Sequence, residues 1–160
     1  MFQITLHPFT RDDTDWLVSQ HATAYARDEG FDDSFGPLVR RILEDFADAH
    51  DPSCEAGWIA WSGSQRLGSV FCVRQSPGVA KLRLFYTEPS ARGTGLGRHL
   101  LETCLNFARS CGYERMELWT HESHAAACAL YEKYGFEAIS RTAVHSFGVD
   151  LIEIIYGRDL

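Results

Sequence analysis

The sequence TEPSARGTGLGRHLL, which runs from Thr87 to Leu101, decides the fold. It places three glycines on alternate positions after a proline and directly before an amphipathic run. A helix start leaves backbone N–H groups without intrahelical partners and carries the positive end of the helix dipole, so it stabilises a bound anion. Glycine lets the anion approach the main chain, and Arg92 and Arg98 add positive charge, with His99 beside them. We therefore predict that main-chain amides of this loop hold a pyrophosphate.

Two other phosphate-binding loops do not fit this stretch. A dinucleotide-binding fingerprint counted from Gly93 and Gly95 needs a third glycine where Arg98 stands. An ATP-type phosphate loop ends in Gly-Lys-Ser or Gly-Lys-Thr, whereas Gly97 is followed by Arg98 and His99. The alternative that stays open is an ordinary glycine-rich turn without a ligand.

The segments around the loop predict a strand, a helix and a second strand. Ala80–Glu88 alternates like a strand, the apolar spacing after Gly95 is helical up to Gly112, and Arg115–His121 alternates again. A connection of this length between two strands favours a parallel pair with a right-handed crossover. Ligands of such sheets bind at the carboxyl ends of the strands, which is where the glycines lie.

The remainder of the chain alternates strand and helix patterns, so we expect an α/β or α+β fold around a mixed sheet, as one domain over residues 1–160. The other predicted elements are an opening strand over 2–9, helices from Thr10 to Gly30 and from Ser34 to Ala49, a hairpin turn at 62–65, a turn at 76–78, a helix from Ala125 to Tyr134, and final strands over 136–146 and 150–157.

Composition limits the partners and the location of the chain. The formal net charge of −7 argues against general binding of nucleic acid. No apolar segment approaches a membrane span and the start lacks a signal-peptide pattern, so we expect a cytoplasmic protein without membrane contact. Acidic residues crowd the first third, where they would attract a cationic substrate or simply form solvated helix faces. They are Asp12, Asp13, Asp15, Asp28, Glu29, Asp32, Asp33, Glu44, Asp45 and Asp48.

Neither the cysteines nor the histidines predict a metal site. The five cysteines are scattered without a Cys-x-x-Cys pair, and we interpret them as small buried hydrophobic residues. They are Cys54, Cys72, Cys104, Cys111 and Cys128. The sequence HESH spaces His121 and His124 three apart, whereas the zinc-protease helix needs a spacing of four.

Two motifs together resemble the GNAT superfamily of N-acetyltransferases, which use acetyl-coenzyme A. Pro-x-x-Arg-Gly-x-Gly-Leu-Gly occupies Pro89–Gly97, and LYEKYGF occupies Leu130–Phe136. The resemblance covers nearly the whole chain and implies a mixed, mostly antiparallel central sheet with a splayed parallel strand pair and about four helices on both faces. AKLRLFYTEPSARGTGLGR and HSFG also resemble the acetyltransferase half of bacterial helix-turn-helix/GNAT fusion proteins.

The resemblance implies roles for particular residues. Main chain of Phe85, Tyr86 and Thr87 would bond the pantetheine arm of the coenzyme, and Tyr131 would give a proton to the departing thiolate. The alternative for Tyr131 is a core aromatic beside a helix stop at Gly135. The sequence lacks the asparagine that many members of the family carry near the start of the helix that contains Tyr131. The loop amides that would hold the pyrophosphate belong to Arg92, Gly93, Thr94, Gly95, Leu96, Gly97 and Arg98.

The acceptor side of the site is less defined. An attacking amine must lose a proton, and the candidate bases are Glu29, Glu88, Glu117, His121 and His145. Alternation places Lys81 and Arg83 on one strand face with Phe85 and Thr87, where the two cations would bind a substrate carboxylate or extend to solvent. Further candidates for contacting the substrate are Tyr25, Glu29, His145 and Asp150, the last two bracketing a turn that forms the lip of the acceptor side or is a simple hairpin.

The resulting hypothesis is an acetyl-coenzyme A-dependent N-acetyltransferase that moves the acetyl group directly to a primary amine of a small molecule or peptide, without a metal. No cysteine lies in a nucleophile motif, which argues against a covalent acetyl-enzyme. One alternative is a non-catalytic acyl-coenzyme A sensor, and another is a nucleotide-dependent enzyme. The acceptor stays open, because two basic residues suggest a carboxylate-bearing amine and the acidic helices suggest a polycation. A homodimer is a further expectation.

Overall fold

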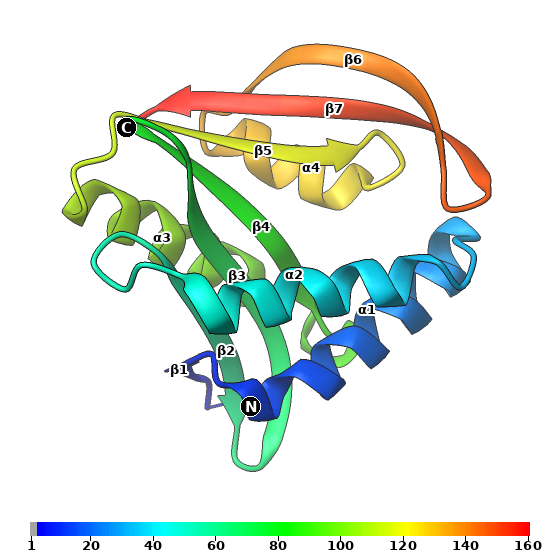
Figure 1. Ribbon diagram of the computed structural model, residues 1–160, viewed down its shortest axis with the longest axis horizontal. Helices are drawn as coiled ribbons and strands as arrows, with labels where there is room; N and C mark the ends of the chain where they lie inside the picture. Colours follow the sequence, from blue (N-terminus) through cyan, green and yellow to red (C-terminus); the bar gives the residue numbers. More distant parts are fainter. Residues whose placement is uncertain (1–2) are drawn as a thin grey trace. The chain divides into compact units, whose positions relative to one another are not determined.

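The computed structural model describes residues 3–160 of the chain, and these form seven strands and four α-helices (Figure 1). The elements are β1 Thr5–Pro8, η1 Arg11–Asp13, α1 Thr14–Glu29, α2 Phe35–Ala49, β2 Ala56–Ser62, β3 Gln65–Ser76, β4 Val79–Thr87, η2 Pro89–Ala91, α3 Leu96–Ser110, β5 Arg115–His121, α4 Ala125–Lys133, β6 Glu137–Ser146 and β7 Val149–Asp159. The predicted elements are confirmed within a few residues at their ends, and Phe2 of the opening strand lies outside the described residues.

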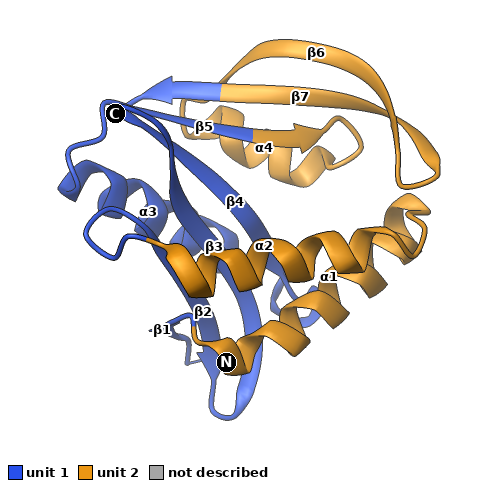
Figure 2. Ribbon diagram, in the orientation of Figure 1, with its two compact units in different colours: residues 1–9, 51–118, 157–160 blue, residues 10–50, 119–156 orange. Residues whose placement is uncertain are grey.

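The strands form one open, mixed sheet in the order β1-β2-β3-β4-β5-β7-β6. β1, β2, β3 and β4 pair antiparallel in sequence order, and β4 pairs with β5 in parallel across the α3 crossover. The predicted fold class, a mostly antiparallel sheet with one parallel pair, is confirmed. Contacts divide the chain into two compact units (Figure 2), so each is described by itself, and the expectation of a single domain stays a prediction.

The first unit consists of residues 3–9, 51–118 and 157–160 and contains β1–β4, α3 and most of β5. Its core lies between β3 and β4 on one side and the apolar face of α3 on the other. A Cβ at Gly68 of β3 would lie 2.5 Å from the backbone oxygen of Tyr86 in β4 and 3.3 Å from both Leu96 and Leu100, so glycine here lets both β4 and α3 approach β3. The buried face of α3 matches its apolar spacing and consists of Leu96, Leu100, Leu101, Cys104, Leu105 and Ala108.

The second unit, residues 10–50 and 119–156, contains α1, α2, α4, β6 and most of β7. The predicted helix start at Thr10 is a capping box, in which the Thr10 backbone N–H donates to Asp13 Oδ2 at 2.8 Å. One 3-10 turn precedes the α-helix proper. α1 ends at Gly30, whose φ of +72° is the left-handed conformation that glycine adopts without strain.

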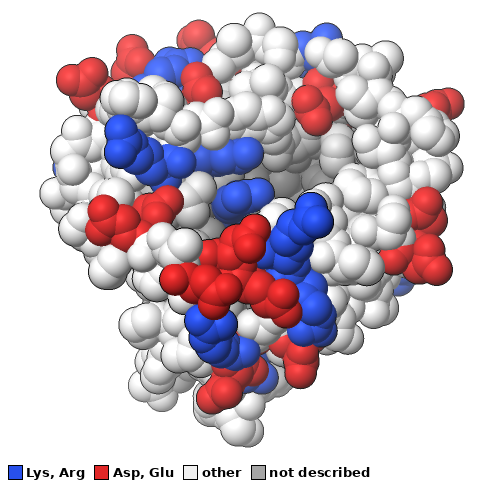
Figure 3. All heavy atoms as spheres, viewed as in Figure 1, with Lys and Arg blue, Asp and Glu red and all other residues white. Residues whose placement is uncertain are grey.

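The acidic residues of the first third lie mostly on the surface and several have basic partners. Arg11 pairs with Asp48 at 2.6 Å, and Arg40 pairs with Asp15 at 2.9 Å. Figure 3 shows acidic and basic side chains interleaved on one face of the molecule. This arrangement favours the interpretation of solvated helix faces over a continuous acidic surface.

The structure shows which of the cysteines are buried. All five cysteines are free, but only Cys72, Cys104 and Cys128 are buried. The prediction of burial is wrong for Cys54 and Cys111, which lie partly exposed in the segments after α2 and α3.

Within residues 3–160, no helix has the length and apolar character that a membrane span requires.

Candidate active site

The glycine-rich loop between β4 and α3 turns tightly in the first unit. Gly93 and Gly95 have φ angles of +79° and +85°, which side-chain-bearing residues rarely adopt. Thr94 donates its backbone N–H to Ala91 at 3.3 Å, and the first α3 bond runs from His99 N–H to Gly95 at 3.0 Å. The two left-handed glycines thus reverse the chain immediately before the helix.

The loop leaves a set of backbone donors unused. Among the described residues, the N–H groups of Gly93 and of 95–98 form no hydrogen bond. A Cβ at Gly93 would meet nothing within 4 Å, so the donors border open space. The side chains of Arg92, Arg98 and His99 are exposed around them. The N–H groups of Arg92 and Thr94, which the sequence analysis also assigned to a pyrophosphate, instead donate to Pro89 at 3.2 Å and to Ala91 at 3.3 Å. The pyrophosphate site stays a prediction, with a helix N-terminus and two exposed guanidinium groups beside the remaining donors.

A β-bulge bends β4 just before this loop. Arg83 lies opposite Phe71 and Tyr86 lies opposite Ser69, so Leu84 and Phe85 together oppose one residue of β3. Leu84 has a φ of +51°, a strained angle for a branched side chain. Bulges of this kind redirect strands next to active sites.

The bulge changes the face of β4 on which the side chains after Arg83 lie. The register places Lys81, Arg83 and Tyr86 opposite Val73, Phe71 and Ser69, which share one face of β3. Thr87 lies opposite Gly68, on the other face. The alternation that placed Phe85 and Thr87 with Lys81 and Arg83 is therefore wrong beyond Arg83, because the extra residue shifts the side-chain period by one.

The parallel pair separates toward the loop. β4 and β5 are paired from Val79 opposite Arg115 to Lys81 opposite Glu117, whereas the pairing of β4 with β3 continues to Thr87. The predicted splayed pair is confirmed. Main chain of Phe85–Thr87 thus lies in the part of β4 beyond the parallel register.

The basic pair of β4 lies in a partly buried environment. Both side chains are half-buried. Burial lowers the pKa of Arg83, because the charged guanidinium loses hydration. The predicted contact of Lys81 and Arg83 with a substrate carboxylate stays a prediction.

In the second unit, Tyr131 is buried in α4. It is 4% exposed, with ring centroids 5.9 Å from Phe136 and 6.0 Å from Tyr156. The helix stop is confirmed, since Gly135 has a φ of +85° and Phe136 donates its N–H to the Tyr131 carbonyl at 3.0 Å. Tyr131 therefore packs as a core aromatic, and its role toward the coenzyme stays a prediction.

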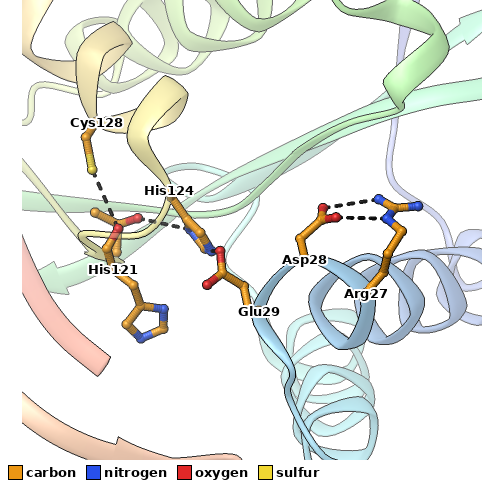
Figure 4. Close-up of polar contacts among 7 residues, drawn as sticks. Arg27, Asp28, Glu29, His121, His124 and Cys128 are labelled. Carbon is orange, nitrogen blue, oxygen red and sulfur yellow. Dashed lines mark hydrogen bonds and ion pairs between the residues drawn. The ribbon is translucent and has the colours of Figure 1, made fainter. Parts of the chain in front are cut away.

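A carboxylate–imidazole pair joins the end of α1 to the start of α4 (Figure 4). His124 Nε2 lies 3.2 Å from Glu29 Oε1, and the two side chains are only 19% and 11% exposed. The other ring nitrogen lies 3.4 Å from Thr120 Oγ1. Burial lowers the pKa of His124, and the Glu29 carboxylate opposes that shift. The sequence analysis named Glu29 as a candidate but did not predict its contact with His124, because no local pattern links two residues so far apart in the chain.

Aromatic rings surround this pair. Tyr25 lies 4.8 Å from Phe35, 4.9 Å from His124 and 5.2 Å from Phe31, measured between ring centroids. Phe147 lies 4.8 Å from Phe31 and 4.9 Å from Phe35. We call Tyr25, Phe31, Phe35 and Phe147 the aromatic cluster. Of its members, sequence reasoning found only Tyr25, although the density of aromatic residues at 25–35 was a usable signal.

The other acceptor-side candidates lie apart from one another in the chain. His145 and Asp150 form an exposed pair at 2.8 Å across the β6–β7 turn. Glu117 of β5 pairs with Arg115 at 3.1 Å, and Glu88 begins η2. No group of three or more His, Cys, Asp or Glu side chains suited to a metal ion occurs in the described part of the chain.

Comparisons with known proteins agree with this geometry. The model of the acetyltransferase (GNAT) family matches residues 16–136. A mycothiol acetyltransferase of Geodermatophilus obscurus is 34% identical over 85 residues, which are 49% of this chain and 28% of that protein. The chain spans between 26% and 54% of the length of the curated relatives that it matches.

Solved structures give the same fold over the full length. An acetyltransferase of Streptococcus agalactiae is 25% identical with a TM-score of 0.81, over 99% of this chain and 100% of its own. A GNAT family acetyltransferase of Elizabethkingia anophelis, solved with acetyl-CoA bound, is 17% identical with a TM-score of 0.69, over 98% of both chains. The second likeness concerns the fold alone.

Proposed function

The chain belongs to the acetyltransferase (GNAT) family, and from this membership we propose that it transfers an acetyl group from acetyl-coenzyme A directly to a primary amine of a small molecule or peptide. One observation carries the proposal: the unused N–H donors of Gly93 and of 95–98 at the start of α3. Acyl transfer needs the coenzyme to be held at the end that is far from the reacting thioester. A loop that grips a diphosphate supplies that anchor.

The chain's own residues have distinct tasks in this proposal. The unused amides of Gly93 and of 95–98 bind the diphosphate, and the side chains of Arg92 and Arg98 add charge-assisted bonds. Main chain of Phe85–Thr87, beyond the bulge, bonds the pantetheine arm. Tyr131 gives a proton to the leaving group.

Acetyl-coenzyme A supplies an activated thioester carbonyl when bound. The amine nitrogen forms a bond to the acetyl carbon, and the bond from that carbon to sulfur breaks. An incoming ammonium releases one proton to become nucleophilic and a second as the amide forms, while the thiolate takes one. The protein therefore needs a proton donor on the sulfur side and a path for protons on the amine side.

Three finer expectations belong to the same proposal. The homodimer and the cytoplasmic location are predictions from sequence. The resemblance to the acetyltransferase half of helix-turn-helix fusion proteins is supported by its motifs. The sensor alternative has no observation in its favour.

The test measures binding and turnover separately. Titration calorimetry with acetyl-coenzyme A should detect binding, and thermal shift should favour it over NAD and ATP. Thiol release with a panel of primary amines should reveal turnover. Binding without turnover on any amine would support the sensor instead, and absence of binding would refute the proposal.

A further inference from the structure

Glu29 is a nearly buried carboxylate whose only ion-pair partner among the described residues is an imidazole. Burial lowers the pKa of His124 and of the adjacent His121, which disfavours a positive charge on either ring. The nearest arginine in the chain, Arg27, donates instead to Asp28 at 2.8 and 3.1 Å (Figure 4). A buried carboxylate with no cation beside it is costly, and a bound cation would offset that cost.

The aromatic cluster gives that cation a suitable surrounding. The faces of aromatic rings attract cations within about 6 Å of the ring centre. Tyr25 contacts His124, the partner of Glu29, and Phe31 contacts His121 with centroids 5.9 Å apart. The cluster therefore lies directly against the carboxylate–imidazole pair. Three of its four rings, on Tyr25, Phe35 and Phe147, are only half-buried.

The turn that carries Phe147 is built to keep its ring in this place. Phe147 has a φ of +54°, which is strained for an aromatic residue. Its carbonyl accepts the Asp32 N–H at 2.9 Å, and its ring is stacked on Phe31. A strained backbone that persists because side-chain contacts hold it is a feature of ligand sites.

The charges near the cluster are predominantly negative. Burial lowers the pKa of His121, and the negative charges of Glu153 and Glu29 oppose that shift. Asp28 and Asp32 flank the same end of α1, and Asp28 is matched by Arg27. A ligand carboxylate placed here would be repelled, whereas an ammonium group would be attracted.

Resting on the function proposed above, we infer that the acceptor is an arylalkyl or otherwise apolar alkyl amine without a carboxylate beside the amino group. Its ammonium group donates to the Glu29 carboxylate, and its apolar body lies against the aromatic cluster. All of these residues belong to the second unit. An acceptor of this class differs from the carboxylate-bearing amine that Lys81 and Arg83 suggest, and also from a polycation.

A matched pair of amines tests the substrate class. 2-Phenylethylamine and phenylalanine differ by one carboxylate, which the negative charges near the cluster would repel. Thiol release should therefore show a kcat/KM at least about tenfold higher for 2-phenylethylamine. Equal values or a preference for phenylalanine would overturn the inference and leave the acetyltransferase proposal intact.

A variant pair tests the carboxylate independently of turnover. Binding of 2-phenylethylamine is measured by calorimetry with coenzyme A, which carries no acetyl group. Glu29→Gln should weaken this binding about tenfold or more, whereas the neighbouring surface change Asp28→Asn should leave it within about twofold. Equal effects of the two changes, or no binding to the unmodified protein, would overturn the inference. Thermal melting and acetyl-coenzyme A affinity confirm that each variant is folded.

The two proposals fail differently. If acetyl-coenzyme A does not bind or no amine releases thiol, the proposed function fails. If 2-phenylethylamine still binds in a Glu29-dependent manner in that case, the inference about the cation site holds.

Discussion

The hydroxyl of Ser69 donates a hydrogen bond of 2.7 Å to the carbonyl oxygen of Leu84. Ser69 is fully buried in β3, and Leu84 is the strained residue of the β4 bulge. The bond satisfies a carbonyl that the bulge removes from the regular ladder. It therefore holds β4 in its bent conformation just before Phe85–Thr87, the segment that we propose contacts the coenzyme.

Ser69→Ala should lower the free energy of unfolding by about 1–3 kcal/mol, because the Leu84 carbonyl loses its donor in a buried place. It should also raise the KM for acetyl-coenzyme A. Urea denaturation and steady-state kinetics measure the two effects. Ser76→Ala, at the exposed end of β3, is the control. A KM equal to that of the unmodified protein would show that the bulge does not shape the coenzyme site.

Gly93→Ala should separate backbone strain from ligand exclusion. Gly93 and Gly112 have φ angles of +79° and +85°, and a Cβ at either would meet no protein atom within 4 Å. Alanine at either position should cost about 1–2 kcal/mol of stability. Only Gly93→Ala should also weaken acetyl-coenzyme A binding, by about tenfold, since its methyl group would occupy the proposed position of the diphosphate. Calorimetry on both variants decides the matter.

Tyr131→Phe tests the proton donor against a neighbouring buried tyrosine. It should reduce kcat by about a hundredfold while the Kd for acetyl-coenzyme A stays constant. Tyr156→Phe removes a hydroxyl that donates to Glu132 at 2.8 Å, so it should cost about 1–3 kcal/mol of stability with little effect on kcat. Turnover by Tyr131→Phe at the normal rate would assign Tyr131 to the core alone.

Local patterns predicted the elements of this fold because each carries its own signal. The helix stop at Gly30, the hairpin at 62–65 and the apolar face of α3 all follow from residue spacing and glycine. The splayed strand pair followed from the family resemblance. The donors of the glycine loop were predicted for the same local reason, since a helix start always leaves amides unpaired.

The features that the sequence did not predict depend on distant segments. The bulge at Leu84 has no glycine or other turn residue to mark it, so the sequence predicted that side chains alternate between the two faces along the whole of β4. The insertion of β7 between β5 and β6 has no local signature. The pair of Glu29 and His124 exists only because the end of α1 and the start of α4 meet in the folded chain. Such contacts are set by packing, which periodicity does not encode.

Stability should fall with acidity because of His21. This residue is fully buried in α1, its ring bonds the Leu17 carbonyl at 2.9 Å, and burial lowers its pKa from 6.5 to about 4. The unfolded chain therefore binds more protons between these values, and up to about 3 kcal/mol of stability is lost as the pH falls from 6.5 to 4. Urea denaturation of His21→Phe should show a shallower pH dependence, by about 1 kcal/mol per pH unit in this window. Identical slopes would contradict the assignment.

Phe147 offers a test in which stability and substrate binding should diverge. It forms a two-residue turn with Gly148, both with positive φ, where asparagine is favoured over an aromatic residue. Phe147→Asn relieves about 1 kcal/mol of backbone strain but loses the stacking on Phe31 and the edge-to-face contact with Phe35, together worth a similar amount. The melting temperature should therefore change little, while the KM for 2-phenylethylamine should rise about tenfold.

Phe147→Leu completes this comparison, because it keeps the strained backbone and an apolar side chain but removes the ring. Phe147→Leu should lower the melting temperature. It should raise the KM for 2-phenylethylamine, but by a smaller factor than Phe147→Asn does. The KM for acetyl-coenzyme A should stay constant in both variants. If both changes leave the KM for the amine unaltered, the Phe147 ring serves only to fix the turn, and the strain at this position has a purely structural origin.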